Sequence, residues 1–357
     1  MEQPGNNPHR KRIDDSRLTI HDSRLTAPRS RLAPLRDRYG RVVTYLRVSI
    51  TDRCNLRCFY CLPRDCGVPQ RAEQLTLAEL TEVVRAAAAL GIHKIRITGG
   101  EPLVRPGVID FVGTLSGLAG VTDLALSTNG TMLAEHAVAL KAAGLMRVNV
   151  SLDSLRPAVF RAISGRNDLD RVVEGIAAAR AAGLRPIKLN VVVMRGVNDD
   201  ELPAMLDFAA ERGAQVRFIE YMPLGIGQRW ESSYVPRVEI LDRIRTHLAP
   251  EPPQRKPGDT ATYYPLRAGG EAGVISPVSC RFCDLCNRLR LTADGKLRPC
   301  LTSEGEVDVR PALRPSLSPA AIATAFQHAV ASRPEHGRYR DTTGHAPAGR
   351  PMAAIGG

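Results

Sequence analysis

The stretch SITDRCNLRCFYC at residues 49–61 decides the fold, because it places Cys54, Cys58 and Cys61 directly after a β-rich run. A second trio lies near the other end of the chain, at Cys283, Cys286 and Cys300. Structural zinc sites are normally closed by four protein ligands, whereas three thiolates can hold a cube of iron and sulfide and leave one iron open. The sequence therefore predicts two clusters, each with an open iron that binds a small molecule.

Zinc is the alternative occupant of each trio, because the chain has a further cysteine near each of them. Cys66 could be the fourth ligand of the first site, and Cys280 that of the second. A thiolate from Cys280 on iron would block the open corner of the second cluster. We expect both residues to be bystanders, and the zinc alternative stays open at this point.

Six β-rich runs alternate with amphipathic or alanine-rich segments in the first two thirds of the chain. The runs cover residues 42–50, 94–98, 123–128, 147–152, 187–194 and 215–221, and the helical segments include residues 77–90, 171–182 and 200–212. Glycines at positions 91, 120, 144, 183 and 213 precede runs, where the end of a helix favours positive φ. Six βα units in series predict an α/β fold, a partial (β/α)6 TIM-like barrel two units short of the complete form.

Candidate binding motifs follow the predicted strands at their carboxyl ends, where parallel sheets and barrels bind ligands. The first cysteine trio follows the first strand, and Thr98-Gly99-Gly100-Glu101-Pro102 follows the second. The third strand leads into Ser-Thr-Asn-Gly at 127–130, the fourth ends at Ser151 and Asp153, and the sixth is followed by Met222. This agreement between topology and motifs predicts one site at this edge.

Composition divides the chain into four segments. Residues 1–38 repeat Asp-Ser-Arg-Leu-Thr and predict a disordered basic leader, and residues 39–224 form the predicted barrel. Gly- and Pro-rich stretches, a helix around residues 238–248 and the second trio predict a smaller C-terminal domain at 225–333, which carries the second cluster and closes the barrel. Residues 334–357 form an irregular tail that ends in Gly-Gly.

The composition also limits the classes of partner that the protein could bind. The formal charge is +12 and the pI about 9.6, but Phe, Trp and Tyr make up only 4% of the chain, which leaves little stacking surface for nucleic acid. An anionic small substrate explains the charge, and we expect no nucleic-acid partner. The sequence has no membrane-spanning apolar run and no signal peptide, which predicts a cytoplasmic protein that makes no membrane contact and keeps its thiols reduced.

Cationic side chains gather on the predicted strands. Arg47, Arg96, Lys188 and Arg217 lie in or near barrel strands, and Arg288 and Arg290 flank the second trio. A single strand arginine is usually solvated or paired with a carboxylate. Several guanidinium groups that converge on one cavity fit a triphosphate, because each can pair bidentately with phosphate oxygens.

These motifs resemble two nested families. A three-cysteine loop after the first strand, with Gly-Gly-Glu-Pro after the second, resembles the radical S-adenosylmethionine (SAM) superfamily. The runs 49–54, 95–103, 149–153, 217–220 and 286–291, with the terminal Gly-Gly, are similar to the GTP 3′,8-cyclase family from about Tyr39 to Gly357. The resemblance implies a radical SAM lyase with two [4Fe-4S] clusters, which converts GTP to (8S)-3′,8-cyclo-7,8-dihydroguanosine 5′-triphosphate in the first step of molybdenum cofactor (molybdopterin) biosynthesis.

The resemblance also implies roles for individual residues. The two trios would ligate the clusters, and SAM would contact Tyr60, Gly100, Ser151 and Met222. GTP would contact Arg47, Arg96, Ser127, Lys188, Arg288, Leu289 and Arg290. We add Arg217 to this set because of its position on a predicted strand. Catalysis would also need Arg288, Arg290, Gly356 and Gly357, with the tail threaded into the barrel.

Partners follow from the same resemblance. It implies a reductant such as flavodoxin or ferredoxin and cyclic pyranopterin monophosphate synthase as the downstream enzyme. A homodimer is a separate expectation, because the sequence does not give the oligomeric state. Two other functions stay open: a radical SAM peptide maturase with an auxiliary cluster, and a basic zinc-binding nucleic-acid protein. Peptide maturases tend to carry more C-terminal cysteines than this chain has, and metal analysis separates all three.

Overall fold

The computed structural model describes residues 1, 34–62, 73–224, 230–337 and 352–356. The helices and strands of the described residues belong to one compact unit, Leu32–Gly357. None of the helices in these ranges combines the length and apolar character that crossing a bilayer requires.

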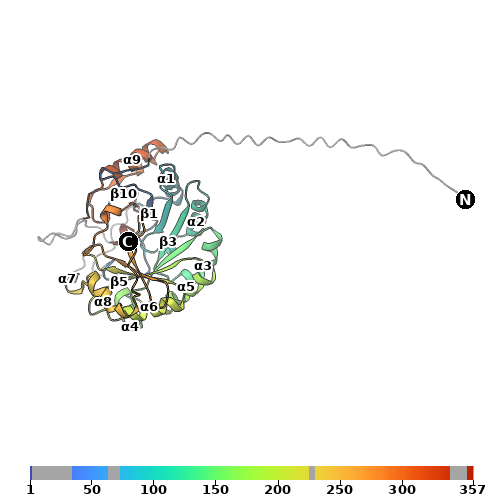
Figure 1. The fold of residues 1–357 in the computed structure, drawn as a ribbon. Helices are drawn as coiled ribbons and strands as arrows, with labels where there is room; N and C mark the ends of the chain where they lie inside the picture. The colour runs from blue at the N-terminus through green and yellow to red at the C-terminus, as the bar shows by residue number, and fades with distance from the viewer. Residues whose placement is uncertain (2–33, 63–72, 225–229, 338–351, 357) are drawn as a thin grey trace. The chain divides into compact units, whose positions relative to one another are not determined.

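Six parallel strands form the centre of this unit, each paired with the next in chain order. They are β1 (Tyr45–Ser49), β2 (Lys94–Thr98), β3 (Asp123–Thr128), β4 (Arg147–Ser151), β5 (Ile187–Val193) and β6 (Gln215–Glu220). The curved sheet has helices around its outside (Figure 1). This arrangement confirms the predicted α/β partial barrel.

The helices occupy the crossovers between these strands and the C-terminal part. They are α1 (Leu77–Ala89), α2 (Val108–Ser116), α3 (Leu133–Ala142), α4 (Pro157–Ser164), α5 (Leu169–Ala181), α6 (Leu202–Glu211), α7 (Trp230–Ser233), α8 (Arg237–Arg243) and α9 (Pro319–Ala331). Helix α1 begins at a capping box, in which Thr76 and Glu79 satisfy each other's backbone N–H groups. The five glycines expected to end helices have φ between 60° and 96°.

The C-terminal strands extend both edges of the same sheet. At one edge β9 (Arg288–Leu291) pairs in parallel with β1, followed by β10 (Lys296–Arg298) and β11 (Val307–Asp308). At the other edge β8 (Glu271–Ile275) pairs in parallel with β6, and β7 (Ala261–Pro265) pairs with β8. The C-terminal part is therefore joined to the barrel through backbone hydrogen bonds, and within Leu32–Gly357 it is not a separate compact unit.

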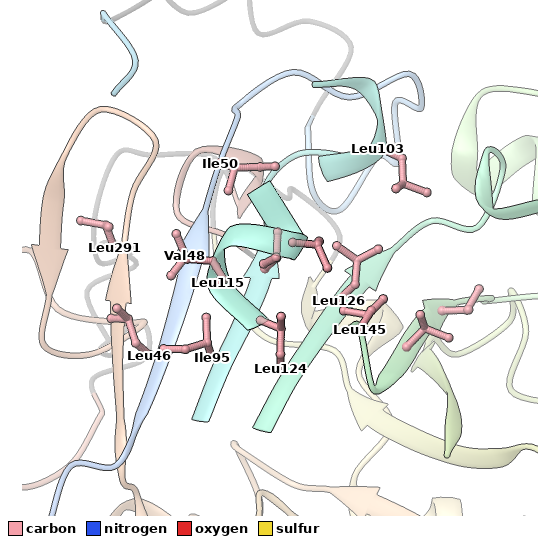
Figure 2. Close-up of a cluster of buried hydrophobic side chains, with 14 of the residues drawn as sticks. Leu46, Val48, Ile50, Ile95, Leu103, Leu115, Leu124, Leu126, Leu145 and Leu291 are labelled. Atoms are coloured by element: carbon pink, nitrogen blue, oxygen red, sulfur yellow. The ribbon is translucent and has the colours of Figure 1, made fainter. Parts of the chain in front are cut away.

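Alternation along each strand separates the hydrophobic core from the barrel interior. Leu46 and Val48 of β1 are fully buried and pack with Leu126 of β3 and Leu115 of α2 (Figure 2). Tyr45 and Arg47 point the other way and line a cavity. Because side chains alternate between the two faces of a strand, the cationic residues are presented to the interior and the apolar ones to the helices.

The boundary of the N-terminal leader differs from the predicted one. Leu35 is buried in the hydrophobic core and Asp37 is 5% exposed, so residues 34–38 belong to the folded unit and the expected end at residue 38 is too late. Their sequence, Ala-Pro-Leu-Arg-Asp-Arg from residue 33, has no periodicity that could indicate this packing. The predicted disorder of residues 2–33 lies outside the described residues.

Candidate active site

All six cysteines of the two trios line one cavity of about 670 Å³ inside the barrel. Cys54, Cys58 and Cys61 reach it from the loop after β1, and Cys283, Cys286 and Cys300 from the segments on either side of β9. Chain positions more than 200 residues apart therefore face one another across a space large enough for small ligands.

The loop that carries the first trio rests on Gly99 and Gly100. Gly100 N donates to Thr51 O at 2.7 Å, and a Cβ at Gly100 would lie 2.3 Å from the carbonyl oxygen of Arg53. A Cβ at Gly99 would lie 2.6 Å from the Thr51 oxygen. No real Cβ tolerates such distances, so both glycines are required by the close approach of the cysteine loop. Gly100 also lines the cavity, in keeping with the expected contact with SAM.

The thiols of the first trio are unfavourable as thiolates unless a cation is present. Burial, and then the neighbouring thiols, raise the pKa of Cys58 well above its ordinary value and that of Cys61 to about 12. Bound iron would supply the positive charge that deprotonates them. Leu56 N and Asn129 Nδ2 lie 3.4 and 3.8 Å from Cys54 Sγ, as hydrogen-bond donors to a cluster sulfur would.

The chemistry of the donor set also fits a cluster. Among the described residues, no three His, Cys, Asp or Glu side chains are spaced to hold a single metal ion. A cube of iron and sulfide takes thiolates at separate corners, and each trio brings three thiols to the cavity for that purpose. Cys280 does not line the cavity, and Cys66 lies outside the described residues.

Two buried carboxyl groups support the loops around the first trio. Glu101 is fully buried and accepts from Leu103 N, Thr128 Oγ1 and Asn129 N, which ties the loops after β2 and β3 together. Burial raises its pKa to about 7. Asp153 accepts from Tyr60 Oη at 2.7 Å, and burial raises its pKa to about 6. Asp153 thereby orients a tyrosine expected to contact SAM.

The second trio lies beside an arginine with free hydrogen-bond donors. Arg288 Nε and Nη2 are buried and have no hydrogen-bond partner among the described residues. Although burial raises the pKa of Cys286, the charge of Arg288, followed by Arg333 and Arg41, holds it below the ordinary value. An anionic cluster and an acceptor on a ligand would satisfy both features, so this trio also fits an iron–sulfur cluster.

Cations from neighbouring strands meet in the cavity. In the sheet Arg47 lies directly opposite Arg96 on one side and Arg290 on the other. Burial, with further lowering by nearby arginines, brings the pKa of Arg47 to about 10 and that of Lys188 to about 8. Like charges on adjacent strands repel each other, so a polyanion bound in the cavity would stabilise the arrangement.

Polar neighbours that the sequence analysis did not single out hold these cations in place. Tyr45 Oη accepts from Arg96 Nε, Asn190 Oδ1 accepts from Arg217 Nη2 at 2.7 Å, and Tyr263 Oη accepts from Lys188 Nζ at 2.8 Å. Although burial opposes it, the charges of Arg96, Arg47 and Arg288 lower the pKa of Tyr45 to about 8. Alternation could have indicated two of these residues, because Tyr45 is two positions from Arg47 and Asn190 two from Lys188.

The remaining candidate residues fall into three groups. Those whose side chains or backbone line the cavity are Tyr60, Gly100, Ser127, Ser151, Arg217, Met222 and Arg290, together with those discussed above. Leu289 does not: its side chain is fully buried in the hydrophobic core, so any contact with substrate must use its backbone. Gly357 lies outside the described residues.

The tail enters the barrel, as expected from the sequence. Gly356 O accepts from Arg47 Nη2 at 3.2 Å and from Arg290 Nη1 at 2.6 Å. The φ of Gly356 is +69°, and a Cβ there would lie 3.0 Å from Thr98 Cγ2 and 3.2 Å from Ser49 Cβ. From the sequence we expected a side chain at Gly356 to collide with bound substrate or cofactor. The structure shows that residues of β1 and β2 already leave little room for a Cβ there.

Known proteins share both halves of this arrangement. The radical SAM superfamily matches residues 48–209, and the family described as Molybdenum Cofactor Synthesis C matches residues 214–339. The GTP 3′,8-cyclase of Alkaliphilus oremlandii is 44% identical over 328 residues, covering 90% of this chain and 100% of the relative. Those of Pelotomaculum thermopropionicum and Geobacter sulfurreducens are 46% and 45% identical, each over 90% of this chain and over 100% and 99% of their own lengths.

A solved structure shows the same fold. Streptococcus suis SuiB bound to its precursor peptide SuiA matches with a TM-score of 0.56 at 14% identity, covering 72% of this chain and 60% of that one. This likeness extends to the fold alone and does not favour the peptide-maturase alternative. Because the relatives at 44 to 46% identity match nine tenths of the chain, and the second family match contains the second trio, the chain belongs to the GTP 3′,8-cyclase family within the radical SAM superfamily.

Proposed function

We propose that this protein converts GTP to (8S)-3′,8-cyclo-7,8-dihydroguanosine 5′-triphosphate, the first step of molybdenum cofactor biosynthesis. The observation that carries the proposal is that both cysteine trios and a group of partly or fully buried cations line a single cavity. One trio would serve a cofactor and the other a substrate, and the cations that line the same cavity suit a triphosphate.

The residues divide the work by position. Cys54, Cys58 and Cys61 would hold the first [4Fe-4S] cluster, beside Tyr60, Gly100, Ser151 and Met222 at the SAM end of the cavity. When bound there, the cluster and SAM supply the deoxyadenosyl radical that removes hydrogen from C3′ of the GTP ribose. Cys283, Cys286 and Cys300 would hold the second cluster at the purine end.

The cations would bind and orient the triphosphate. Arg47, Arg96, Lys188 and Arg217 approach the cavity from β1, β2, β5 and β6, so they surround it rather than form one patch. Holding GTP from several strands fixes the ribose against the SAM end, which is the positioning that attack on guanine C8 needs. The two unpaired donors of Arg288 would bind an acceptor on GTP.

Reconstitution under anaerobic conditions tests the proposal. Purified protein should contain about eight irons and no zinc, and should form the cyclised nucleotide from GTP when given SAM and a reductant. Mass spectrometry of the nucleotide and metal analysis are the measurements. Zinc in place of iron would support the nucleic-acid alternative, and two clusters without GTP binding would support the peptide maturase.

Loss of one ligand of the second trio should separate substrate binding from cofactor cleavage. In Cys300→Ala we expect about half of the iron to be lost, GTP binding to weaken and cyclisation to fail, because the substrate cluster lacks a thiolate. Deoxyadenosine should still form, since the first trio is intact. GTP affinity measured by equilibrium dialysis would contradict this assignment if it were unchanged.

The pH dependence of GTP binding should follow two groups with pKa values of about 8, Lys188 and Tyr45. Above pH 8 Lys188 loses its positive charge and Tyr45 gains a negative one, so both changes weaken binding of a triphosphate. From pH 7 to 9 we expect the Kd of GTP to rise by up to about tenfold for each group. Lys188→Arg should remove one contribution and Tyr45→Phe the other, whereas equal pH profiles in all three proteins would refute the assignment.

The remaining partners are proposals from family membership. A low-potential donor such as flavodoxin or ferredoxin would reduce the first cluster, and cyclic pyranopterin monophosphate synthase would take the product. We also propose a homodimer and a cytoplasmic location, where reducing conditions preserve free thiols; the seven cysteines among the described residues are free. The sequence-based boundaries after residues 224 and 333 remain our proposal for the limits of the barrel, the C-terminal part and the tail, with the folded unit starting at residue 34.

A further inference from the structure

Asp37 is a buried carboxylate held between two arginines from opposite ends of the folded unit. Its Oδ2 accepts from Arg41 Nε at 2.6 Å and from Arg333 Nη1 at 2.9 Å. Its Oδ1 accepts from the backbone N–H groups of Tyr39 and Arg41, both at 3.0 Å. Although burial opposes it, the hydrogen bonds of Arg41 and the charge of Arg333 hold the pKa of Asp37 below its ordinary value, so it is ionised.

The two guanidinium groups also hold the backbone of the second trio. Arg41 Nη1 donates to Cys283 O at 3.0 Å, and Arg333 Nη2 donates to Cys286 O at 2.6 Å. Gly337 N lies 3.4 Å from Cys283 Sγ as a hydrogen-bond donor. Two cysteine ligands are therefore fixed, through two arginines, to one carboxylate.

Asp37, Arg41 and Arg333 join distant parts of the chain, and they also leave a net positive charge beside the second trio. Two arginines and one aspartate sum to +1, and both arginines line the cavity that contains the cysteines. Arg333 is only 2% exposed, so water screens this charge weakly. Nearby positive charge and hydrogen bonds both raise the reduction potential of an iron–sulfur cluster.

We propose that Asp37, Arg41 and Arg333 are positioning residues for the second cluster: they fix Cys283 and Cys286 as ligands and raise the potential of the cluster. The proposal rests on the proposed function in that it requires a second cluster. It assigns a role to the segment 34–41, which precedes the barrel, and to residue 333 at the end of the C-terminal part.

Two substitutions that change the charge of this group in opposite directions test the proposal. Arg333→Gln removes a positive charge and should lower the potential of the second cluster, whereas Asp37→Asn removes a negative charge and should raise it. The potential is measured by redox titration with EPR on the full-length, anaerobically loaded protein. A Cys58→Ala background leaves the second cluster as the source of the signal.

Iron content provides the second measurement. Both variants should retain less than about half of the iron of the second trio, because the ligand loop has lost hydrogen bonds. Iron content and deoxyadenosine formation are measured without the Cys58→Ala change, so that the first trio is intact. If too little iron of the second trio remains for titration, its selective loss, with normal deoxyadenosine formation by the first cluster, supports the positioning role. Arg333→Lys keeps the positive charge but not the guanidinium group, which donates to Asp37 and Cys286 at once. This variant should therefore lose iron from the second trio without a shift in the potential of the second cluster.

Glu79→Gln is the matched control. Glu79 is also a partly buried carboxylate bound by an arginine, with Arg314 Nη2 at 2.9 Å, but it lies on α1 and does not line the cavity. This variant should keep both clusters and both potentials. Full iron and unaltered potential in Asp37→Asn and Arg333→Gln, or shifts of the same sign, would overturn the proposal. About four rather than about eight irons in the unaltered protein would instead refute the second cluster itself.

Discussion

Replacing Cys58 with alanine should remove about half of the iron and abolish reductive cleavage of SAM. Cys58 is partly buried and lines the cavity with Cys54 and Cys61, and two thiolates cannot hold the cube for which three are needed. The measurements are iron per chain and deoxyadenosine released after reduction. GTP should still bind, because the second trio and the cations are unchanged.

Cys280→Ala is the control for this experiment, because Cys280 is a partly buried cysteine that does not line the cavity. It should keep about eight irons and normal deoxyadenosine formation. Deoxyadenosine release by Cys58→Ala at the rate of the unaltered protein would show that the first trio does not ligate the cofactor-cleaving cluster.

Gly356→Ala should abolish the cyclised product while both clusters and SAM cleavage persist. An alanine at a φ of +69° costs about 1 to 2 kcal/mol, and its Cβ would press on Thr98 and Ser49. The tail would withdraw, and Gly356 O would no longer accept from Arg47 and Arg290. Those two cations would then lose the partner that sets their direction in the cavity.

Gly196→Ala is a matched control, since Gly196 has a φ of +67° but nothing within 4 Å of the position of a Cβ. It should lose a similar amount of stability and keep full turnover. A protein that ends at Ile355 and still turns over at the normal rate would show that the tail is dispensable.

Local sequence patterns predicted the barrel strands well. β2 and β3 have the expected boundaries, and the other four differ by three residues or fewer at each end. The reason is that each strand is short and alternates between core and cavity, and that β2 to β6 each follow a glycine with positive φ after the preceding helix. The same alternation places Leu289 in the core between Arg288 and Arg290, so the pattern Arg-Leu-Arg-Leu could have excluded its side chain from the site.

Pairings between distant segments could not be predicted in this way. Nothing in residues 288–291 indicates that β9 pairs with β1, some 240 positions earlier, because a short alternating strand pairs equally well with many others. Asp37 is a similar case. A single aspartate in a polar segment predicts a solvated side chain, and only the meeting of residues 37, 41 and 333 makes it a buried anchor.

The sequence by itself determined the chemistry: two open trios of thiolates, glycines that admit the first trio's loop, and more cations on strands than carboxylates to neutralise them. These are properties of residue type and short-range spacing. The tertiary structure decided that both trios share one cavity, that the tail enters it, and that Asp37 holds the second trio through two arginines. These features depend on which strands pair and which distant side chains are buried against one another. Both depend on the packing of the whole sheet rather than on local sequence.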